Sequence, residues 1–237
     1  MTVCIVSIYA TLLGTYGDAG NVQALRHQAR LRGIDVDVVE VAAGEPIPAS
    51  GDLYVLGGGE DTAQTAAARA IREDGSLHTA VDNGAAVLAV CAGYQLLGEY
   101  FPDGQGQPAP GLDLIDIRTD RLPTRAVGEL AADPVSLDLP RLSGYENHGG
   151  ATHRGPDVAP LARVLAGVGN GDGTEGAVSG HIVGTYLHGP GLARNPRLAD
   201  TLLGWCIGED LPALEQPEVD ALREERLRTV LGERWNS

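Results

Sequence analysis

The sequence contains no lysine, and all 17 of its basic residues are arginine. These are outnumbered by 32 acidic residues, so the formal net charge is −15 at pH 7. A protein that binds nucleic acid or an anionic membrane surface through electrostatics needs the opposite balance. Without lysine the chain also has no Walker A phosphate loop. The composition therefore argues against these partners and is compatible with a polar protein partner.

Cysteine and long apolar runs are scarce as well. Cys4, Cys91 and Cys206 form an odd set without a Cys-x-x-Cys pair, which predicts neither a disulfide framework nor a zinc or other metal site. No stretch reaches the roughly 18 apolar residues of a membrane span. No basic segment precedes the apolar residues 3–8, as a secretion signal would require. We therefore expect a cytoplasmic protein in which Cys4 and Cys206 are packing residues.

What the sequence does contain is an alternation of strand and helix signals. Apolar stretches typical of strands lie at 2–9, 53–56 and 85–90, and residues 35–41 alternate between acidic and apolar side chains as a strand does. Helical spacing between them makes repeated βα units, which predict an α/β fold with a mostly parallel central sheet and helices on both faces. Shorter strands in the second half predict an antiparallel extension of that sheet. We expect a single domain over 1–237, with a charged, solvated helical tail from about 209 to 237.

The most informative segment is AAVLAVCAGYQLLG, residues 85–98. An apolar run ends at Cys91, small residues follow, and an amphipathic helix is predicted from Tyr94. A strand that ends in a sharp, glycine-assisted turn into a helix is the layout of a nucleophile elbow. Such a turn places the sulfur at a helix N-terminus, where the dipole favours a thiolate. Cys91 is therefore a candidate nucleophile; the alternative is a small buried hydrophobic residue.

A thiolate nucleophile needs a base that takes and returns protons. His188 ends the predicted strand in HIVGTYLHGPG, and open α/β folds place their sites at the carboxyl ends of strands. His188 is the preferred candidate, and a histidine that caps a turn is the alternative interpretation. His148, predicted to follow a strand, is the second candidate. His27 and His78 are expected at the surface of helices.

Three consecutive glycines in LGGGED, residues 56–61, follow a buried strand one βα unit before Cys91. Glycines leave backbone N–H groups accessible and allow close approach of a substrate. The backbone N–H groups of these glycines and of Ala92, the residue after the nucleophile, are therefore candidate donors to an oxyanion. A simple glycine turn between strand and helix is the alternative.

Together these motifs resemble the class I glutamine amidotransferases, a flavodoxin-like α/β family. The resemblance rests on the strand followed by GGG, on CxGxQ at Cys91 to Gln95, and on TYLHGP at 185–190. It extends from about residue 3 to about residue 207, with the motifs in the expected order. The subgroup that these motifs resemble most is the cobyric acid synthase-like one. Within that subgroup, YGDAGN at 16–21, GYENHGG at 144–150 and GTYLHGP at 184–190 are similar to motifs of separate glutaminase subunits.

The resemblance implies roles for individual residues. Cys91 would attack the side-chain amide of glutamine, and His188 would serve as acid and base. The backbone N–H groups of Gly58 or Gly59 and of Ala92 would hold the oxyanion. Gln95 would help to fix the glutamine, and Arg121 would bind its carboxylate, with Arg118 or Arg125 as alternatives.

Many class I members carry a glutamate two residues after the histidine, but this chain has Pro190 there. A Cys-His pair is therefore the minimal interpretation. The candidates for a third residue are Asp18, Glu146 and Glu175. Asp18 could equally cap the helix that begins near Gly20.

The resemblance also implies a partner. Such domains supply ammonia to a synthetase, and this chain is too short to contain one. The motifs are most similar to those of glutaminase subunits that work in a heterodimer with a Mur-ligase-like synthetase, which amidates the D-glutamate α-carboxyl of the peptidoglycan stem peptide on lipid II. ATP and Mg²⁺ would then bind to the partner, and this chain would need no cofactor. Alternatives are a subunit for a corrinoid synthetase, a non-catalytic binding module on the same fold, and a cysteine hydrolase of the related peptidase type.

Overall fold

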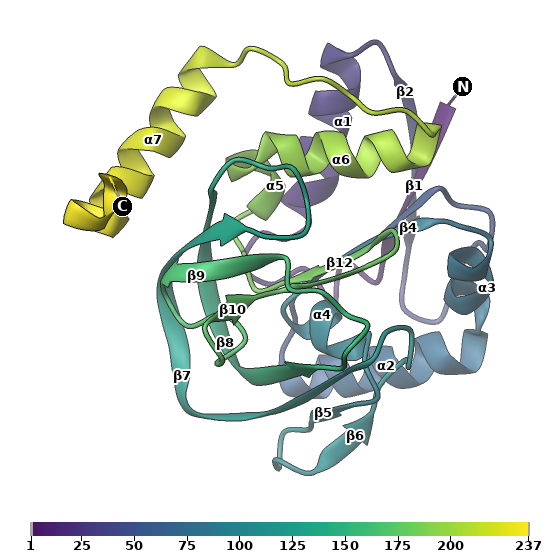
Figure 1. Cartoon of the computed structure of the whole chain (residues 1–237). Coiled ribbons are helices and arrows are strands. Elements are labelled where there is room, and N and C mark those ends of the chain that lie inside the picture. Colours follow the sequence, from purple (N-terminus) through teal and green to yellow (C-terminus); the bar gives the residue numbers. More distant parts are fainter. Residues whose placement is uncertain (1, 237) are drawn as a thin grey trace.

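The predicted central sheet is confirmed. In the computed structural model, which describes residues 2–236, it has six strands in the order β11-β12-β4-β3-β1-β2 (Figure 1). Within that described range, the edge strand β11 is the one strand of this sheet that runs antiparallel to its neighbour. The strands span Thr2–Ile8 (β1), Asp35–Val41 (β2), Leu53–Leu56 (β3), Ala86–Val90 (β4), Ala177–Ser179 (β11) and Ile182–Thr185 (β12).

Helices cover both faces of this sheet. On one face lie α1, α5 and α6, and on the other lie α2 and α4, with α3 beside α2 (Figure 1). Their bounds are Gly20–Leu31 (α1), Asp61–Asp74 (α2), Ser76–Asp82 (α3), Ala92–Leu96 (α4), Gly191–Arg194 (α5) and Pro196–Ile207 (α6). Helices α2 and α6 end at Gly75 and Gly208, whose φ values of 73° and 70° suit the left-handed residue that commonly terminates a helix.

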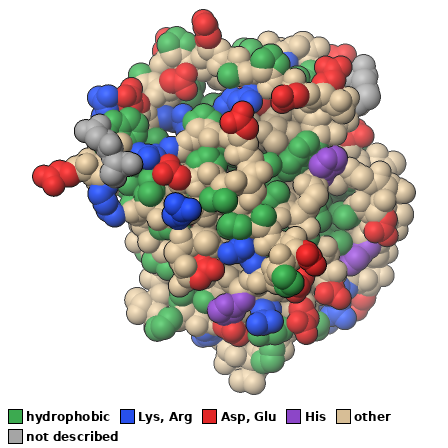
Figure 2. Space-filling model, viewed as in Figure 1, with side chains coloured by type: hydrophobic (Ala, Val, Ile, Leu, Met, Phe, Trp, Pro, Cys, Tyr) green, Lys and Arg blue, Asp and Glu red, His purple; other side chains and the backbone are tan. Residues whose placement is uncertain are grey.

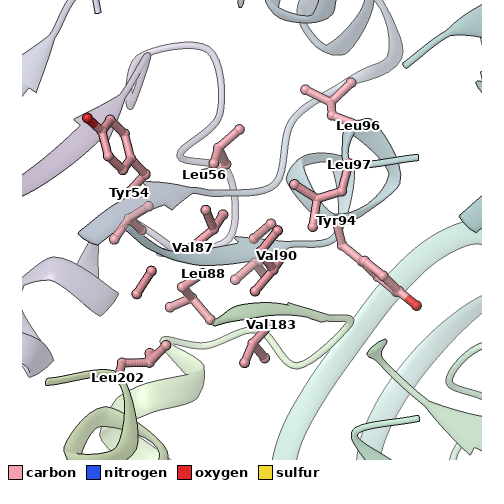
Figure 3. Close-up of a cluster of buried hydrophobic side chains, with 14 of the residues drawn as sticks. Tyr54, Leu56, Val87, Leu88, Val90, Tyr94, Leu96, Leu97, Val183 and Leu202 are labelled. Carbon is pink, nitrogen blue, oxygen red and sulfur yellow. The ribbon is translucent and has the colours of Figure 1, made fainter. Parts of the chain in front are cut away.

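The core explains the continuous apolar runs of the central strands. Every residue of β3 and β4 is buried, because strands covered on both faces have no solvent side to alternate with. Figure 3 shows side chains of β3, β4 and β12 between Leu202 of α6 on one side and Tyr94 and Leu96 of α4 on the other.

Most of the antiparallel strands form a sheet of their own, in the order β10-β9-β7-β8, instead of extending the central sheet. They span Ile117–Pro134 (β7), Leu142–Arg154 (β8), Ala162–Ala166 (β9) and Thr174–Glu175 (β10). The long strand β7 runs through Pro123 without a break. It can do so because its pairing with β8 is irregular between Arg121 and Ala126, which accommodates a residue without an N–H.

The structure differs from the sequence-based expectation in two smaller respects. Residues 104–110 are rich in Gly, Gln and Pro, which predicts a loop, but β6 (Pro108–Pro110) lies within them and pairs with β5 (Tyr100–Pro102) in a hairpin. The tail contains α7 (Pro217–Leu231) and a short 3-10 helix (Gly232–Asn236), and it is not fully solvated. Leu227 and Leu231 of α7 are buried against Ala131 of β7.

The surface agrees with the composition. Acidic and arginine side chains are interspersed over the face in Figure 2, and the hydrophobic side chains there occur in small groups. Over residues 2–236, no helix combines the length and the apolar character needed to cross a membrane.

The topology brings four chain segments to one edge of the central sheet. Strands β12, β4, β3 and β1 are neighbours and run parallel, so their carboxyl ends lie side by side. The segments that follow them contain His188, Cys91, the three glycines from Gly57, and the loop of residues 9–19. A site built at this edge can therefore combine residues that lie far apart in sequence.

Candidate active site

Cys91 lies between β4 and α4 in the strained backbone conformation of a nucleophile elbow. Its φ of 52° and ψ of −106° are in a region that non-glycine residues seldom adopt. Gly93 allows the turn, because a Cβ there would lie only 2.8 Å from the carbonyl oxygen of Leu56. All five residues of α4 are buried. The prediction of an amphipathic helix is therefore wrong, since protein covers both sides of this short helix.

His188 follows β12 by three residues, and its side chain is fully buried. Its Nδ1 donates to the carboxylate of Asp18, at 2.8 Å from Oδ2 and 3.0 Å from Oδ1. Asp18 lies in the loop between β1 and α1 and is also buried. Of the three acidic residues considered for the third position, Asp18 is the one that contacts His188. It fixes the tautomer that leaves Nε2 free to take a proton.

The imidazole and the cysteine share a crevice beside Gly58. A Cβ built on Gly58 would lie 2.8 Å from Cε1 of His188 and 3.4 Å from Cβ of Cys91. Nε2 of His188 has no hydrogen-bond partner among the described residues. Burial lowers the pKa of His188, but its interactions with Asp18 and with the sulfur of Cys91 outweigh burial and raise the pKa to about 10. An imidazolium beside the sulfur is the environment that activates a cysteine.

Glu146 and His148 contact each other instead of the Cys91–His188 pair. The carboxylate of Glu146 accepts two backbone N–H groups from the glycine-rich loop after β9, and it lies 3.3 Å from Nε2 of His148. Nδ1 of His148 lies 3.0 Å from the carbonyl oxygen of Gly150. Both ring nitrogens are therefore engaged, and His148 has no free nitrogen to act as a base. His148 also lies within β8 and not after a strand as predicted.

Glu175 anchors the segment that leads to His188. Its Oε1 accepts hydrogen bonds from the hydroxyl of Thr185 and from the backbone N–H of Tyr186, while Oε2 has no partner within the described part of the chain. Burial raises the pKa of Glu175 to about 7, although the hydrogen bonds from Thr185 and Tyr186 lower it in part. Glu175 therefore supports the chain two residues before His188 without touching its ring.

Replacing Glu175 by glutamine keeps the acceptor but removes the ionisation. The carboxyl ionises near pH 4.5 when unfolded and near pH 7 when folded, so the wild type loses stability as pH rises through this window. We expect Glu175→Gln to gain up to about 3 kcal/mol in unfolding free energy relative to wild type between pH 4.5 and pH 8, measured by urea denaturation. The exposed Glu225→Gln is the control. A difference in unfolding free energy between Glu175→Gln and wild type that stays constant with pH would contradict the expectation.

Gly58 cannot donate to an oxyanion as predicted, because its N–H already donates to Oδ2 of Asp18 at 2.8 Å. This hydrogen bond instead stabilises the carboxylate that holds His188. The amides of Gly59 and Ala92 make no hydrogen bond elsewhere in the described chain, and both residues line the cavity beside Cys91. They stay the predicted oxyanion donors.

Cys91 opens into a cavity of about 250 Å³. One wall comes from the loops and helices of the central sheet, including Ala92 and Gln95, and the opposite wall comes from β7 and β8, including Asn147. Sites for drug-sized ligands have about 300–1,000 Å³, so this cavity suits a ligand of the size of one amino acid.

Two of the three arginines considered for carboxylate binding line this cavity. Arg121 is half exposed and donates to a backbone carbonyl of the β5–β6 hairpin loop. Arg125 donates to Oδ1 of Asn147 at 2.7 Å and to the hydroxyl of Tyr16 at 3.4 Å. Arg118 is exposed and lies outside the cavity. Both Arg121 and Arg125 are therefore placed to meet a substrate carboxylate.

Three residues that line this cavity were not predicted from the sequence. Tyr16, with a φ of 62°, packs the edge of its ring against His188, with 5.1 Å between the ring centroids. The backbone carbonyl oxygen of Asn147 lies 3.9 Å from the sulfur of Cys91. Tyr16 belongs to the motif YGDAGN and Asn147 to GYENHGG, so these motifs contained the signal. Gln64 is buried and contacts Gln95; within an alanine-rich helix, it had no sequence signal.

Comparison with known proteins agrees with this geometry. Residues 4–196 match the CobB/CobQ-like glutamine amidotransferase domain. The chain is 35% identical over 229 residues to the glutamine-hydrolysing lipid II isoglutaminyl synthase subunit GatD of Staphylococcus aureus strain N315, covering 94% of this chain and 92% of the relative. It is 39% identical over 163 residues to cobyric acid synthase of Rhizobium leguminosarum bv. trifolii, covering 65% of this chain and 32% of that protein.

The fold is also similar to that of a solved glutamine amidotransferase. A crystal structure of a glutamine amidotransferase superposes with a TM-score of 0.59 at 20% identity, covering 85% of this chain and 98% of the other. The match to the domain family extends over most of the chain, including Asp18, Cys91 and His188. The chain therefore belongs to the family of CobB/CobQ-like glutamine amidotransferases.

Proposed function

We propose that this chain is the glutaminase subunit of a lipid II isoglutaminyl synthase. It hydrolyses L-glutamine and delivers ammonia to a Mur-ligase-like synthetase of the MurT type, which amidates the D-glutamate α-carboxyl of the peptidoglycan stem peptide. The similarity to GatD over nearly the full length of both chains supports this assignment. The observation that carries it is the group of Cys91, His188 and Asp18 beside a cavity of amino-acid size.

Acylation begins when the thiolate of Cys91 attacks the side-chain carboxamide carbon of glutamine. The backbone N–H groups of Gly59 and Ala92 hold the developing oxyanion. The imidazolium of His188 then protonates the departing nitrogen, and ammonia leaves as the thioester forms. Asp18 holds Nδ1 throughout, so the proton is delivered from Nε2.

Deacylation uses the same groups, but His188 now acts as a base instead of an acid. The neutral imidazole of His188 removes a proton from water, which attacks the thioester carbon of the acylated Cys91. Glutamate is released and the thiolate returns. Arg121 or Arg125 binds the substrate carboxylate and keeps the carboxamide facing the sulfur.

The synthetase is a separate polypeptide in this proposal, and the two subunits form a heterodimer in the cytoplasm. ATP and Mg²⁺ bind to the partner, where the acceptor carboxylate is activated, and this chain needs no cofactor. A sequence without lysine has no Walker A loop of its own, which supports this division of labour.

A corrinoid synthetase is the second candidate partner, because cobyric acid synthase is 39% identical in the matched region. That match covers only 32% of the cobyric acid synthase chain, as expected for an amidotransferase part of a larger enzyme. A binding module without activity is disfavoured by the intact group of Cys91, His188 and Asp18.

The test combines this chain with a MurT-like subunit, lipid II, ATP, Mg²⁺ and glutamine, and follows the stem peptide by mass spectrometry. We expect conversion of one carboxyl to a carboxamide. With Cys91→Ala, glutamine should give no product, whereas free ammonium should still support amidation by the partner. A peptidase would show no dependence on glutamine. Amidation of a cobyrinate-type corrinoid with its synthetase, and none of lipid II, would contradict the proposal.

A further inference from the structure

We propose that Gln64 is a positioning residue for glutamine recognition: it fixes the side-chain amide of Gln95 so that an N–H group of Gln95, and not its carbonyl oxygen, is available to the substrate. This inference rests on the proposed glutaminase function and deepens it. Gln64 belongs to α2, while Gln95 belongs to α4, and both line the cavity beside Cys91.

The orientation of Gln64 is fixed by a backbone group. Its side-chain nitrogen, Nε2, lies 3.3 Å from the carbonyl oxygen of Ala92 and 2.9 Å from Oε1 of Gln95. A backbone carbonyl oxygen can only accept, so the atom of Gln64 that faces it must be the NH₂ group. The atom of Gln95 that faces the same NH₂ group must then be its oxygen, which leaves its own NH₂ group on the other side.

The NH₂ group of Gln95, on the other side of the amide from its oxygen, acts as a donor in turn. Its Nε2 donates to the hydroxyl of Tyr186 at 3.3 Å. Since an amide NH₂ group cannot accept, the Tyr186 hydroxyl must donate onward, and Oγ1 of Thr152 lies 2.7 Å from it. Thr152 in turn lies 3.1 Å from the hydroxyl of Thr119. The result is a buried chain of hydrogen bonds with a defined polarity, set at one end by Ala92 and Gln64.

This polarity decides what the cavity offers to a ligand. Tyr186 uses one hydrogen of the Gln95 NH₂ group, and no other described residue accepts the second. Gln95 retains 7% exposure where it lines the cavity. The carboxamide and carboxylate oxygens of glutamine are acceptors, so an N–H group attracts them. If the amide of Gln95 turned over, its oxygen would repel the same groups.

The experiment uses Gln64→Met, which keeps the length of the side chain but removes both hydrogen bonds. We expect kcat/KM for glutamine to fall about tenfold, chiefly through KM, as for one misplaced hydrogen bond. Labelling of Cys91 by diazo-oxo-norleucine, a glutamine analogue, should slow by the same factor. Alkylation by iodoacetamide, which needs only the sulfur, should stay within about twofold of wild type and also reports that the site has folded.

Three further variants test whether the loss comes from the hydrogen bonds of Gln64 to Ala92 and Gln95. Gln64→Glu has the same shape but presents only acceptors, and we expect the same loss. Thr65→Val lies on the exposed face of the same helix, where its hydroxyl bonds only to the carbonyl of Asp61, and should match wild type. In a Gln95→Met background, Gln64→Met should cost less than about twofold, because coupled residues are not additive.

The outcomes separate the two proposals. An unchanged KM and an unchanged ratio of the two labelling rates in Gln64→Met, or an undiminished effect in the Gln95→Met background, would overturn the role of Gln64 while leaving the glutaminase function intact. A wild-type protein that reacts with iodoacetamide but neither with diazo-oxo-norleucine nor with glutamine would overturn both.

Discussion

Replacing Cys91 by serine or alanine is expected to reduce glutamine hydrolysis to below about one thousandth of the wild-type rate. Alanine has no nucleophile, and a serine hydroxyl is far harder to ionise than a thiol, so neither variant forms the thioester. Glutamate and ammonia release, measured in the complex with the synthetase, is the readout.

The fold should survive these substitutions. Serine and alanine are no larger than cysteine and meet the same backbone requirement at φ 52°, so the thermal unfolding midpoint should change little. Ammonia release at the wild-type rate by Cys91→Ala would contradict the assignment. His188→Ala should be nearly as inactive, and a retained rate in that variant would point to His148 as the base despite its engaged nitrogens.

Replacing Asp18 by asparagine is expected to lower kcat by roughly 10²- to 10⁴-fold, in the range seen when the carboxylate of a catalytic triad is neutralised. The carboxylate fixes the tautomer of His188 and stabilises its protonated form. An uncharged amide does neither, and it can present an N–H group where Nδ1 of His188 needs an acceptor.

The same variant should change the titration of His188. In the wild type the imidazolium should persist up to a pKa of about 10, and any stability it contributes is lost as pH rises through that value. In Asp18→Asn the pKa should fall, which NMR of the imidazole detects. The exposed Asp113→Asn is the control. An unchanged kcat together with an unchanged titration would refute the role of Asp18.

The sequence contained enough to predict the elbow, because every feature that makes it is local. A buried strand, a cysteine and Gly93 are consecutive, and the requirement for glycine at that position is visible in the close approach of Leu56. The mostly parallel sheet was predictable for the same reason, since each βα unit has its own apolar pattern. His188 could be placed at a strand end, although only the sheet order shows that this strand is the neighbour of β4.

The choice among Asp18, Glu146 and Glu175 could not be made from the sequence. Asp18 meets His188 across 170 residues, through an irregular loop whose path no periodicity describes. The exclusion of Gly58 as an oxyanion donor depends on the same loop, because Asp18 takes its N–H. The separate antiparallel sheet was also beyond reach, since whether a strand joins one sheet or another is decided by tertiary packing.

The hydrogen bond between Asp18 and His188 joins the first tenth of the chain to its last quarter. During synthesis, the nucleophile and the carboxylate emerge from the ribosome long before the histidine that completes them. A nascent chain that has made β1 to β4 has a thiol with no proton acceptor at its side, and β12 must dock beside β4 before the imidazole arrives. Ammonia production is thereby postponed until β12 and His188 have been made and docked beside β4, so shorter nascent chains cannot hydrolyse glutamine.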